Sequence, residues 1–560
     1  MVVIAQSLKR GKMNIVKELQ KQEIKVTYED VERKVRNYFD KDEIHYLSAS
    51  LIAGLMAHLY ACVNNINNFD SIRQLWYGDG ITSGRWFLQI LGDVAEVIWG
   101  IWDVGFFNRI ITLLLIVIAA GMIPKIYGFQ NKLLGILSCV IFVVYPTVTS
   151  MMFYSHTSVY YAIAVIMSLF SVYSIEKKYI GGIISSILIT YATGIYQASF
   201  TFVATLMLIR LIMSVINNKN IPFGNTMKKA VKYFIVLVVG LCHYFVMTKI
   251  TVYIYGDELS SYQGINTFGM KNINDIPRIV ADTWKGFFRE LLWGMNSEYG
   301  IALTGVMRLS SLVLLIISLL IVLFVLCDKG TMLNKMLLTI LLILWPFTVN
   351  SINFASYGNR IYTLMVYSFY GVFLLSMLLL DYYLQCNDSK SIKINKLKKG
   401  LKITEIIIYF VVSSNYVYQS NGNYEVMSYM DQKTVNKIML IMSQVYNLEG
   451  YTPDMDIVFV NSYSNAQCED PFWYASPFKY GGQWNLINCY TINCFPETYI
   501  GINPKIKSIY NVDMEGFLKI DGYNEDEYIK KMPLYPADGS VQIYNGEVIV
   551  KFDPDYIPYE

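Results

Sequence analysis

Residues 308–327 read RLSSLVLLIISLLIVLFVLC, a stretch in which Arg308 is the one charged side chain. A helix needs about 20 apolar residues to cross the hydrocarbon core of a bilayer, which is about 30 Å thick. The sequence therefore predicts an all-α polytopic membrane bundle of about eleven transmembrane helices. The other ten stretches lie near residues 44–64, 105–124, 132–149, 157–176, 180–197, 199–216, 232–253, 333–350, 361–380 and 403–419.

The composition of the 560-residue chain also indicates a membrane protein. Hydrophobic residues make up 54% of it and charged residues 16%, with a mean hydropathy of +0.37, whereas a soluble domain carries about 25% charged residues. The apolar stretches fill the middle of the chain, while the last 140 residues have the composition of a soluble domain. The net charge of +3 gives no electrostatic footprint for nucleic acid. Residues 1–43 are too charged to be a signal peptide.

Positive charges alternate from one side of the predicted bundle to the other. Cytoplasmic loops are enriched in Lys and Arg, so this alternation indicates orientation. It predicts a cell-membrane protein with a cytoplasmic N-terminus and an external C-terminus. On that assignment the cytoplasmic loops hold Lys125, Lys132, Lys177, Lys178, Lys219, Lys228, Lys229, Lys329 and Lys335, followed by the basic run of Lys390, Lys393, Lys396, Lys398, Lys399 and Lys402.

The predicted organisation has three parts. Residues 1–43 form a charged cytoplasmic segment, and residues 44–420 form the bundle, with long external loops at 65–104 and 254–306. Residues 421–560 form a small external α/β domain. Its expected elements are a helix near 425–447, a strand at Asp456–Val460, and a hairpin of Ser540–Tyr544 and Glu547–Phe552 around the turn Asn545-Gly546.

Each long external loop contains an amphipathic stretch. In Trp86–Asp103 and in Ile276–Met295, polar side chains share one helical face and apolar side chains lie opposite. Helices of this kind rest in the membrane interface. We expect the two helices to roof a cleft at the outer leaflet that admits the head group of a lipid substrate. The plainer alternative is that both helices only anchor their loops.

Two acidic residues in the first external loop are candidates for a general base. Asp70 is the first carboxylate after the opening span, and Asp79 lies between two glycines, which let the backbone approach a ligand closely. Sugar transfer from a lipid phosphate needs a base for the acceptor hydroxyl and cations for the phosphate leaving group. The alternative for either residue is a turn-forming or capping role, which fits Asp79 better than Asp70.

Two arginines are candidates for binding the phosphate. Arg85 follows Ser83-Gly84, and Arg360 lies at the outer mouth of the tenth stretch, in a loop with few other positive charges. Arg suits phosphate because its planar guanidinium donates hydrogen bonds in a fork. Arg360 is alternatively a snorkelling anchor and Arg85 a loop-to-helix contact. Tyr196, Gln197 and His156 lie at external span ends, where they either bind sugar hydroxyls or anchor the interface.

Several short motifs resemble the GtrII-type glucosyltransferase family, and in particular its Gram-positive members. The resemblance extends along the whole chain. The motifs are Asn68-Phe69-Asp70-Ser71, Ser83-Gly84-Arg85-Trp86-Phe87, Tyr196-Gln197 and the closing run Met532-Pro533-Leu534-Tyr535-Pro536-Ala537-Asp538-Gly539-Ser540-Val541.

This resemblance implies a GT-C-like membrane bundle that moves a sugar, glucose by family type, from a polyprenyl-phosphate donor to a cell-envelope glycan. The implied partners are the lipid-linked donor, the surface glycan acceptor, membrane lipid, and a synthase and a flippase that supply the donor. No cofactor or metal is implied. Many members carry paired acids where this chain has Asp70-Ser71, which leaves open whether Asp79 supplies a second carboxylate.

Two other functions compete with this interpretation. An O-antigen-type polymerase or ligase has a similar number of spans but relies on external Arg or His rather than on an early acid. A transporter of lipid-linked glycans is expected to place charges within its spans and to show matched halves. The predicted spans here are nearly free of charge, and the two halves of the sequence do not match. The sequence also has no Walker-A loop, no cytosolic nucleotide-sugar domain and no His/Cys cluster with zinc spacing.

Overall fold

The structure is a computed structural model, and it describes the membrane bundle and parts of the C-terminal unit. The described residues are 41–64, 66, 80–100, 104–178, 180–217, 222–261, 272–293, 304–327, 331–359, 361–386, 392–455, 457–460, 506–508, 510–512, 518–520 and 526–551.

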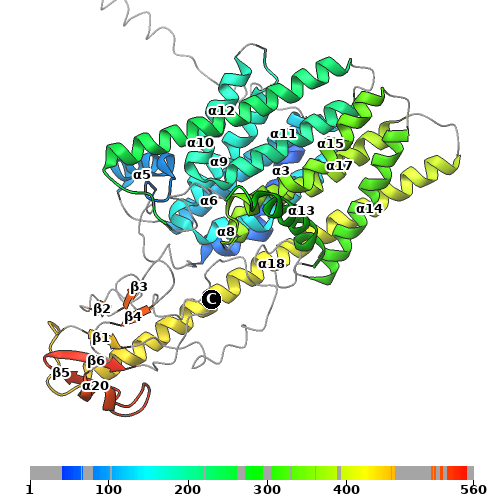
Figure 1. Ribbon diagram of the computed structural model, residues 1–560. Helices are drawn as coiled ribbons and strands as arrows, with labels where there is room; N and C mark the ends of the chain where they lie inside the picture. The colour runs from blue at the N-terminus through cyan, green and yellow to red at the C-terminus, as the bar shows by residue number, and fades with distance from the viewer. Residues whose placement is uncertain are drawn as a thin grey trace, which may run out of the picture.

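Long helices lie side by side and build the bundle (Figure 1). Within the described residues, nine helical segments are long and apolar enough to cross a membrane, as an all-α polytopic fold requires. They are α3 (Lys41–Val63), α6 (Gly105–Tyr127), α7 with α8 (Lys132–Val144 and Pro146–Phe153), α9 (Ser155–Ser174), α11 (Ala198–Asn217), α12 (Phe223–Tyr255), α14 (Gly305–Cys327), α15 (Met332–Val349), and α17 (Tyr370–Gln385) with the short helix before it.

The predicted all-α membrane bundle is confirmed, and each of the eleven predicted stretches lies on a helix. Two of them do not meet the criteria for a spanning helix, one because of its length and the other because of its hydropathy. The stretch 180–197 becomes α10 (Gly181–Ile195), with only 15 residues. The stretch 403–419 is part of α18 (Ile392–Tyr446), where polar side chains such as Glu405 lower the hydropathy. The stretch 132–149 is broken between α7 and α8, because a residue before proline, here Tyr145, disfavours helical backbone.

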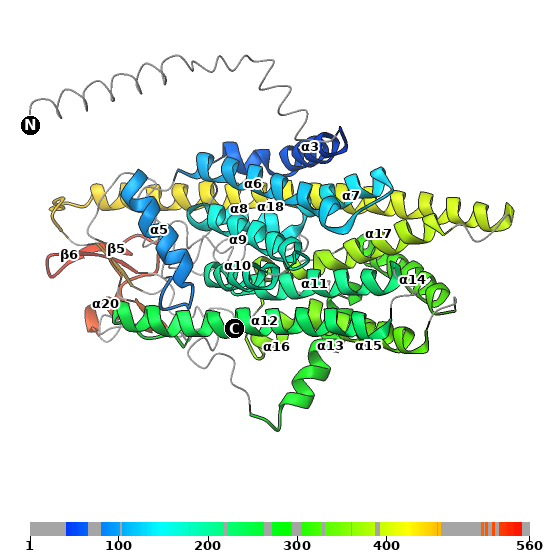
Figure 2. The ribbon, with the colours of Figure 1, turned by 90° about the horizontal axis from the view of Figure 1, so that it is seen from above.

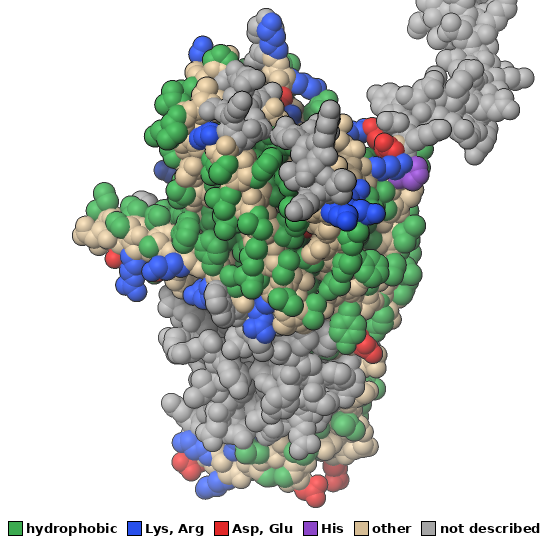
Figure 3. All heavy atoms as spheres, turned by 90° about the vertical axis from the view of Figure 1, so that its right-hand side faces the viewer, with side chains coloured by type: hydrophobic (Ala, Val, Ile, Leu, Met, Phe, Trp, Pro, Cys, Tyr) green, Lys and Arg blue, Asp and Glu red, His purple; other side chains and the backbone are tan. Residues whose placement is uncertain are grey.

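Aromatic rings fill the centre of the bundle. The Phe142 ring lies 4.9 Å from that of Tyr367 and 5.0 Å from that of Tyr370, and Phe202 stacks on Tyr367 at 4.9 Å. The Tyr367 hydroxyl donates to the Phe142 carbonyl oxygen at 2.8 Å. These hydroxyls find acceptors inside the bundle, as an apolar surrounding requires. Many other hydrophobic side chains, such as Leu319 and Ile343, are exposed on the outside of the bundle, and Figure 3 shows hydrophobic side chains over much of one face.

Both predicted amphipathic helices are present. The first, α5 (Trp86–Trp99), packs against α10 and α12, and the second, α13 (Ile276–Trp293), packs against α14, α15 and α16 (Ser351–Ala355). Figure 2 shows them at the edges of the bundle. Each buries one apolar side, exemplified by Leu88 and Phe287, while Trp99 remains 72% exposed at the end of α5. Two short 3-10 helices, Thr363–Met365 and Tyr367–Phe369, lead into α17.

The helix α18 leaves the bundle as one continuous 55-residue helix and reaches the C-terminal unit (Figure 1). There four of the described strands form a sheet in the order β2-β1-β6-β5, with β1 parallel to β2 and β6, and β5 antiparallel to β6, while β3 and β4 form a separate antiparallel pair. Asn545 and Gly546 both have positive φ at the turn between β5 and β6, as a tight two-residue hairpin requires. The elements are β1 (Ile457–Val460), β2 (Ile506–Ser508), β3 (Tyr510–Val512), β4 (Leu518–Ile520), α20 (Glu527–Lys531), β5 (Val541–Tyr544) and β6 (Glu547–Lys551).

Candidate active site

Arg85 lies directly before α5, at the end of a turn formed by residues 80–84. The Gly84 N–H donates to the Ile81 carbonyl oxygen at 2.9 Å, and the Arg85 N–H donates to the Gly80 carbonyl oxygen at 2.6 Å. Gly84 has a φ of 71°, a left-handed conformation that glycine adopts without steric cost. The turn therefore fixes the position of Arg85 at one end of the bundle.

The Arg85 side chain contacts the junction between α10 and α11. Its Nε donates to Gln197 Oε1 at 3.4 Å, and its guanidinium carbon lies 5.1 Å from the centre of the Tyr196 ring, a cation–π distance. Gln197 Nε2 donates back to the Ser83 carbonyl oxygen at 2.6 Å. Arg85 and Gln197 are 112 positions apart in the chain, so this pairing is a product of the tertiary fold.

Trp86 packs against α10 and supports this junction. Its side chain is 1% exposed and rests on Gly194, where an added Cβ would lie 2.7 Å from the indole Cε2 atom. The Tyr191 ring packs against the indole at 5.4 Å. From α12, the Tyr244 hydroxyl donates to the Gly84 carbonyl oxygen at 3.1 Å. Glycine is thus required at position 194 for the indole to approach the α10 backbone.

We expect Gly194→Ala to displace Trp86 and, through it, Arg85. Overpacking of this kind costs about 1–3 kcal/mol, so both the melting temperature and the transfer rate should fall. Gly224→Ala is the matched control, because a Cβ at that helical position meets no atom within 4 Å. Thermal unfolding and activity of the two variants test this. A Gly194→Ala protein with an unchanged transfer rate would show that Trp86 does not position the site.

His156 joins the same end of the bundle from α9. Its ring is 8% exposed, and the charge of Arg85 acts on it electrostatically. The neighbouring Tyr161 ring packs against Tyr196 at 4.9 Å. The structure therefore brings Arg85, Tyr196 and Gln197 into contact and places His156 at the same end of the bundle, within electrostatic range of Arg85.

The other three candidates, Asp70, Asp79 and Arg360, lie outside the described residues. Their roles as base and phosphate ligand therefore stay predictions.

Arg109 belongs to this end of the bundle and was missed by the sequence reasoning. It lies in the first turns of α6, is 1% exposed, and donates from Nε to the Met152 carbonyl oxygen at 2.8 Å. Its two terminal nitrogens donate to the carbonyl oxygens of Asn64, at 3.4 Å, and Ile66. Arg109 thus ties α6 and α8 to the chain just before Asp70. The signal was present in the sequence, because an arginine within an apolar stretch is costly and marks a functional or buried partner.

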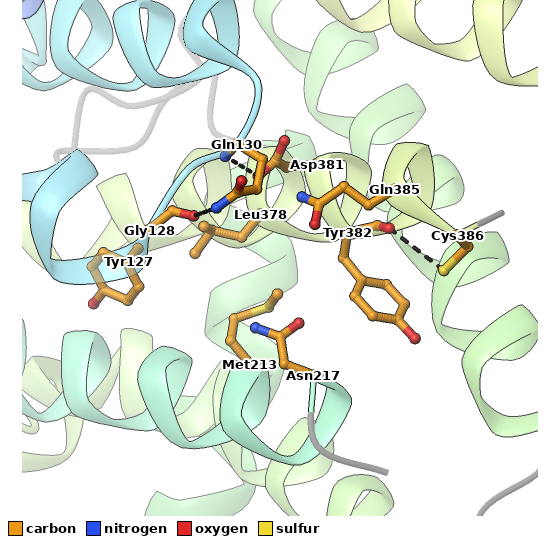
Figure 4. A pocket seen from close by; sticks show the side chains of 10 residues that line it. All are labelled: Tyr127, Gly128, Gln130, Met213, Asn217, Leu378, Asp381, Tyr382, Gln385 and Cys386. Atoms are coloured by element: carbon orange, nitrogen blue, oxygen red, sulfur yellow. Dashed lines mark hydrogen bonds between the residues drawn. The ribbon is translucent and has the colours of Figure 1, made fainter. Parts of the chain in front are cut away.

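The opposite end of the bundle contains a cavity of about 290 Å³ (Figure 4). Asn217, at the far end of α11 from Gln197, helps to line it, and α11 is about 30 Å long at about 1.5 Å per residue. Asp381 is already engaged there, since its two carboxylate oxygens accept the backbone N–H groups of Gln130 and Asn131 at 2.9 Å each. The cavity contains none of the predicted site residues, and Asp381 stabilises the turn between α6 and α7.

The described side chains around Arg85 suit a phosphorylated sugar. A guanidinium binds phosphate oxygens, while a carboxamide, a phenol and an imidazole exchange hydrogen bonds with hydroxyl groups. Within the described residues, no three His, Cys, Asp or Glu side chains are grouped as metal ligands.

Residues 59–375 match the family model described as Glucosyl transferase GtrII. The matched segment includes every predicted site residue and ends before α18 begins. No curated protein and no solved structure matches the chain.

Proposed function

We propose that this chain, which belongs to the GtrII glucosyltransferase family, moves a glucosyl unit from a polyprenyl-phosphate donor to a cell-surface glycan. Family membership makes it a membrane glycosyltransferase with a sugar donor and a glycan acceptor. The lipid-linked donor, the acceptor's place at the outer face and the residue roles are our proposal. The observation that carries it is the cluster of Arg85, Tyr196, Gln197 and His156 at one end of the bundle.

In the proposed reaction, Asp70 removes the proton from an acceptor hydroxyl, and the resulting oxygen attacks the anomeric carbon of the donor sugar. The bond between that carbon and the phosphate oxygen breaks, and the polyprenyl phosphate leaves with the bonding electrons. Arg85 and Arg360 bind the phosphate and stabilise the charge that develops on it. Tyr196, Gln197 and His156 hold the sugar hydroxyls, so that the anomeric carbon faces the attacking oxygen.

Arg109 supports this assignment of Asp70. It donates to the carbonyl oxygens of Asn64 and Ile66, which lie six and four residues before Asp70 in the chain. These buried contacts hold the backbone at residues 64 and 66, just before the proposed base in the sequence, and positioning of a base is a large part of its catalytic effect. Asp79 is the proposed source of a second carboxylate, because it directly precedes the turn that holds Arg85.

We also propose that the Arg85 end of the bundle faces the cell exterior. Basic side chains concentrate at the other end, where Glu176 accepts from Arg210 at 3.2 Å and pairs with Lys229 at 2.8 Å. Burial opposes the ionisation of Glu176, but Lys229, Tyr233 and Arg210 outweigh it and lower the pKa to about 2. Lys125 and Lys132 pair with Glu43 and Asp42 at the same end. Such a concentration of lysines is typical of the cytoplasmic side. The Arg85 end then faces outward, and the donor that we propose for this outward-facing site is the lipid-linked sugar.

Membrane vesicles of known sidedness test donor and orientation together. We expect transfer from a panel of radiolabelled polyprenyl-phosphate sugars to be fastest with glucose. Envelope glycan is too large to cross the membrane, so glycan added outside should be labelled by right-side-out vesicles. Inside-out vesicles should label it only after detergent is added, because their active site faces the lumen.

Two results would contradict the proposal. Transfer from a nucleotide sugar with no lipid carrier would reject the lipid-phosphate donor. Labelling by sealed inside-out vesicles, with none by right-side-out vesicles, would place the Arg85 end on the cytoplasmic side.

A further inference from the structure

A second cavity, far from Arg85, lies where α18 meets the C-terminal unit. It has a volume of about 280 Å³ and lies between the last turns of α18 and the stretch 537–541. We call it the polar cleft. The helix contributes Ser443 and Gln444, the segment after its end contributes Asn447, and the facing stretch contributes Asp538 and Gly539 among its lining residues.

The side chains of the polar cleft favour a neutral ligand rich in hydroxyl groups. Two carboxamides, one hydroxyl and one carboxylate line it, and together they donate and accept several hydrogen bonds. No Lys or Arg is among its described lining residues, which disfavours a phosphate ligand, since phosphate is bound by cations. Carbohydrate fits this set of groups.

A glycine turn lines the polar cleft on the side of the stretch 537–541. Gly539 has a φ of 82°, and its carbonyl oxygen accepts from Gln542 Nε2 at 2.6 Å. A Cβ at position 539 would lie 3.0 Å from that same Gln542 nitrogen. Glycine is therefore suited to this turn. The sequence run in which it occurs is one of those that resemble the family's Gram-positive members.

The distance between the polar cleft and the bundle indicates which of the two substrates binds in the cleft. Tyr424 is still inside the bundle, where its hydroxyl bonds to His58 Nδ1 at 2.8 Å. Ser443 lies further along the same unbroken helix (Figure 1), at a distance of about 30 Å given a rise of about 1.5 Å per residue. A sugar on a membrane-anchored phosphate stays at the level of the head groups. Of the two substrates, only the glycan chain reaches both the level of the head groups and the polar cleft.

We propose that the polar cleft binds sugar units of the acceptor glycan at a distance from its reacting end. The proposal rests on the proposed function, because it takes the acceptor to be a surface glycan. Binding at two places on one chain makes the second contact intramolecular and raises the apparent affinity. The enzyme should therefore use long acceptors at lower concentration than short ones.

The test compares two acceptor probes, both size-fractionated from purified envelope polysaccharide of the producing cell: long chains and short oligosaccharides. We expect the double variant Asn447→Ala/Asp538→Ala to raise the KM for long chains about tenfold, as the loss of a few hydrogen bonds implies. The KM for short oligosaccharides and both kcat values should stay unchanged. Lys531→Ala is the matched control, since its side chain is 80% exposed on the same unit and does not line the cleft.

Direct binding of the long chains to the purified full-length protein completes the test. The double variant should bind them about tenfold more weakly than the control does. Equal binding and equal KM for long chains would overturn the cleft as a glycan site. A rise in KM for short and long acceptors alike would also overturn it, because the effect would not depend on reach. If the wild-type protein binds long chains through the cleft but transfers no sugar, the proposed function fails and the binding site stands.

Discussion

Asp70→Asn is expected to lower the turnover of sugar transfer by about 10²–10⁴-fold, the usual contribution of a general base. Asparagine keeps the size and much of the hydrogen-bonding capacity of aspartate, but it does not take a proton from the acceptor hydroxyl. The variant should therefore remain folded in the membrane with a near-native melting temperature. Steady-state transfer from polyprenyl-phosphate glucose, measured beside thermal unfolding, gives both values.

Asp79→Asn is the matched comparison for this prediction. If Asp79 only shapes the turn before Gly80, its loss should change turnover far less than the loss of Asp70. Near-native turnover in Asp70→Asn, together with a large loss in Asp79→Asn, would transfer the role of base to Asp79. Large losses in both variants would indicate a pair of carboxylates that act together.

Arg85→Gln should lower kcat by about 10²–10³-fold, the cost of removing one donor that stabilises transition-state charge. Arg85 contacts Tyr196 and Gln197, and its proposed role in the reaction is to hold the donor phosphate. Arg85→Lys should recover only part of the activity, because a point charge does not reproduce the planar fork of donors. The loss should fall on kcat more than on the acceptor KM, since the contact strengthens as the phosphate leaves.

Arg360→Lys should behave in the same way if both arginines bind the phosphate. The matched control is Arg278→Lys on α13, an exposed arginine whose Nε lies 3.8 Å from Asp282 Oδ2. Arg278→Lys should leave kcat unchanged. Full activity in Arg85→Lys would reject the bidentate role and leave Arg85 as a contact between loop and helix. Full activity in Arg360→Lys would identify that residue as a snorkelling anchor.

The sequence alone determined the membrane bundle, because the requirement for it is local. Every backbone polar group in a bilayer must bond within its own helix, so about 20 apolar residues in a row specify a spanning helix. The stretch 308–327 accordingly lies on α14. The same local rule explains the amphipathic helices α5 and α13, whose apolar side chains recur at helical spacing. It also explains the hairpin at Asn545-Gly546, since few residues adopt the positive φ that this turn requires.

The sequence also pointed to individual site residues, but not to their arrangement. Tyr196, Gln197 and His156 were predicted from residue type and position at an external span end, and Arg85 from its guanidinium in a loop poor in positive charge. Nothing in a single sequence states that Arg85 donates to Gln197, 112 positions away. Arg109 lies within the predicted stretch 105–124, and its role depends on acceptors that the sequence does not reveal. Those acceptors, the carbonyl oxygens of Met152, Asn64 and Ile66, come from other parts of the chain.

Only the tertiary structure decided how these elements meet, because packing between helices depends on contacts that are distant in sequence. Trp86 approaches Gly194 closely because Gly194 has no Cβ and the indole ring of Trp86 is flat. This contact places Arg85 at the α10–α11 junction. The length of α18 was likewise decided by tertiary contacts. The predicted span at 403–419 and the predicted helix near 425–447 are one helix that continues through Gly422. This helix contacts α3 and α7 in the bundle and β5 in the C-terminal unit. Local rules thus specified which segments are helical and apolar, while packing specified which of their polar residues share a site.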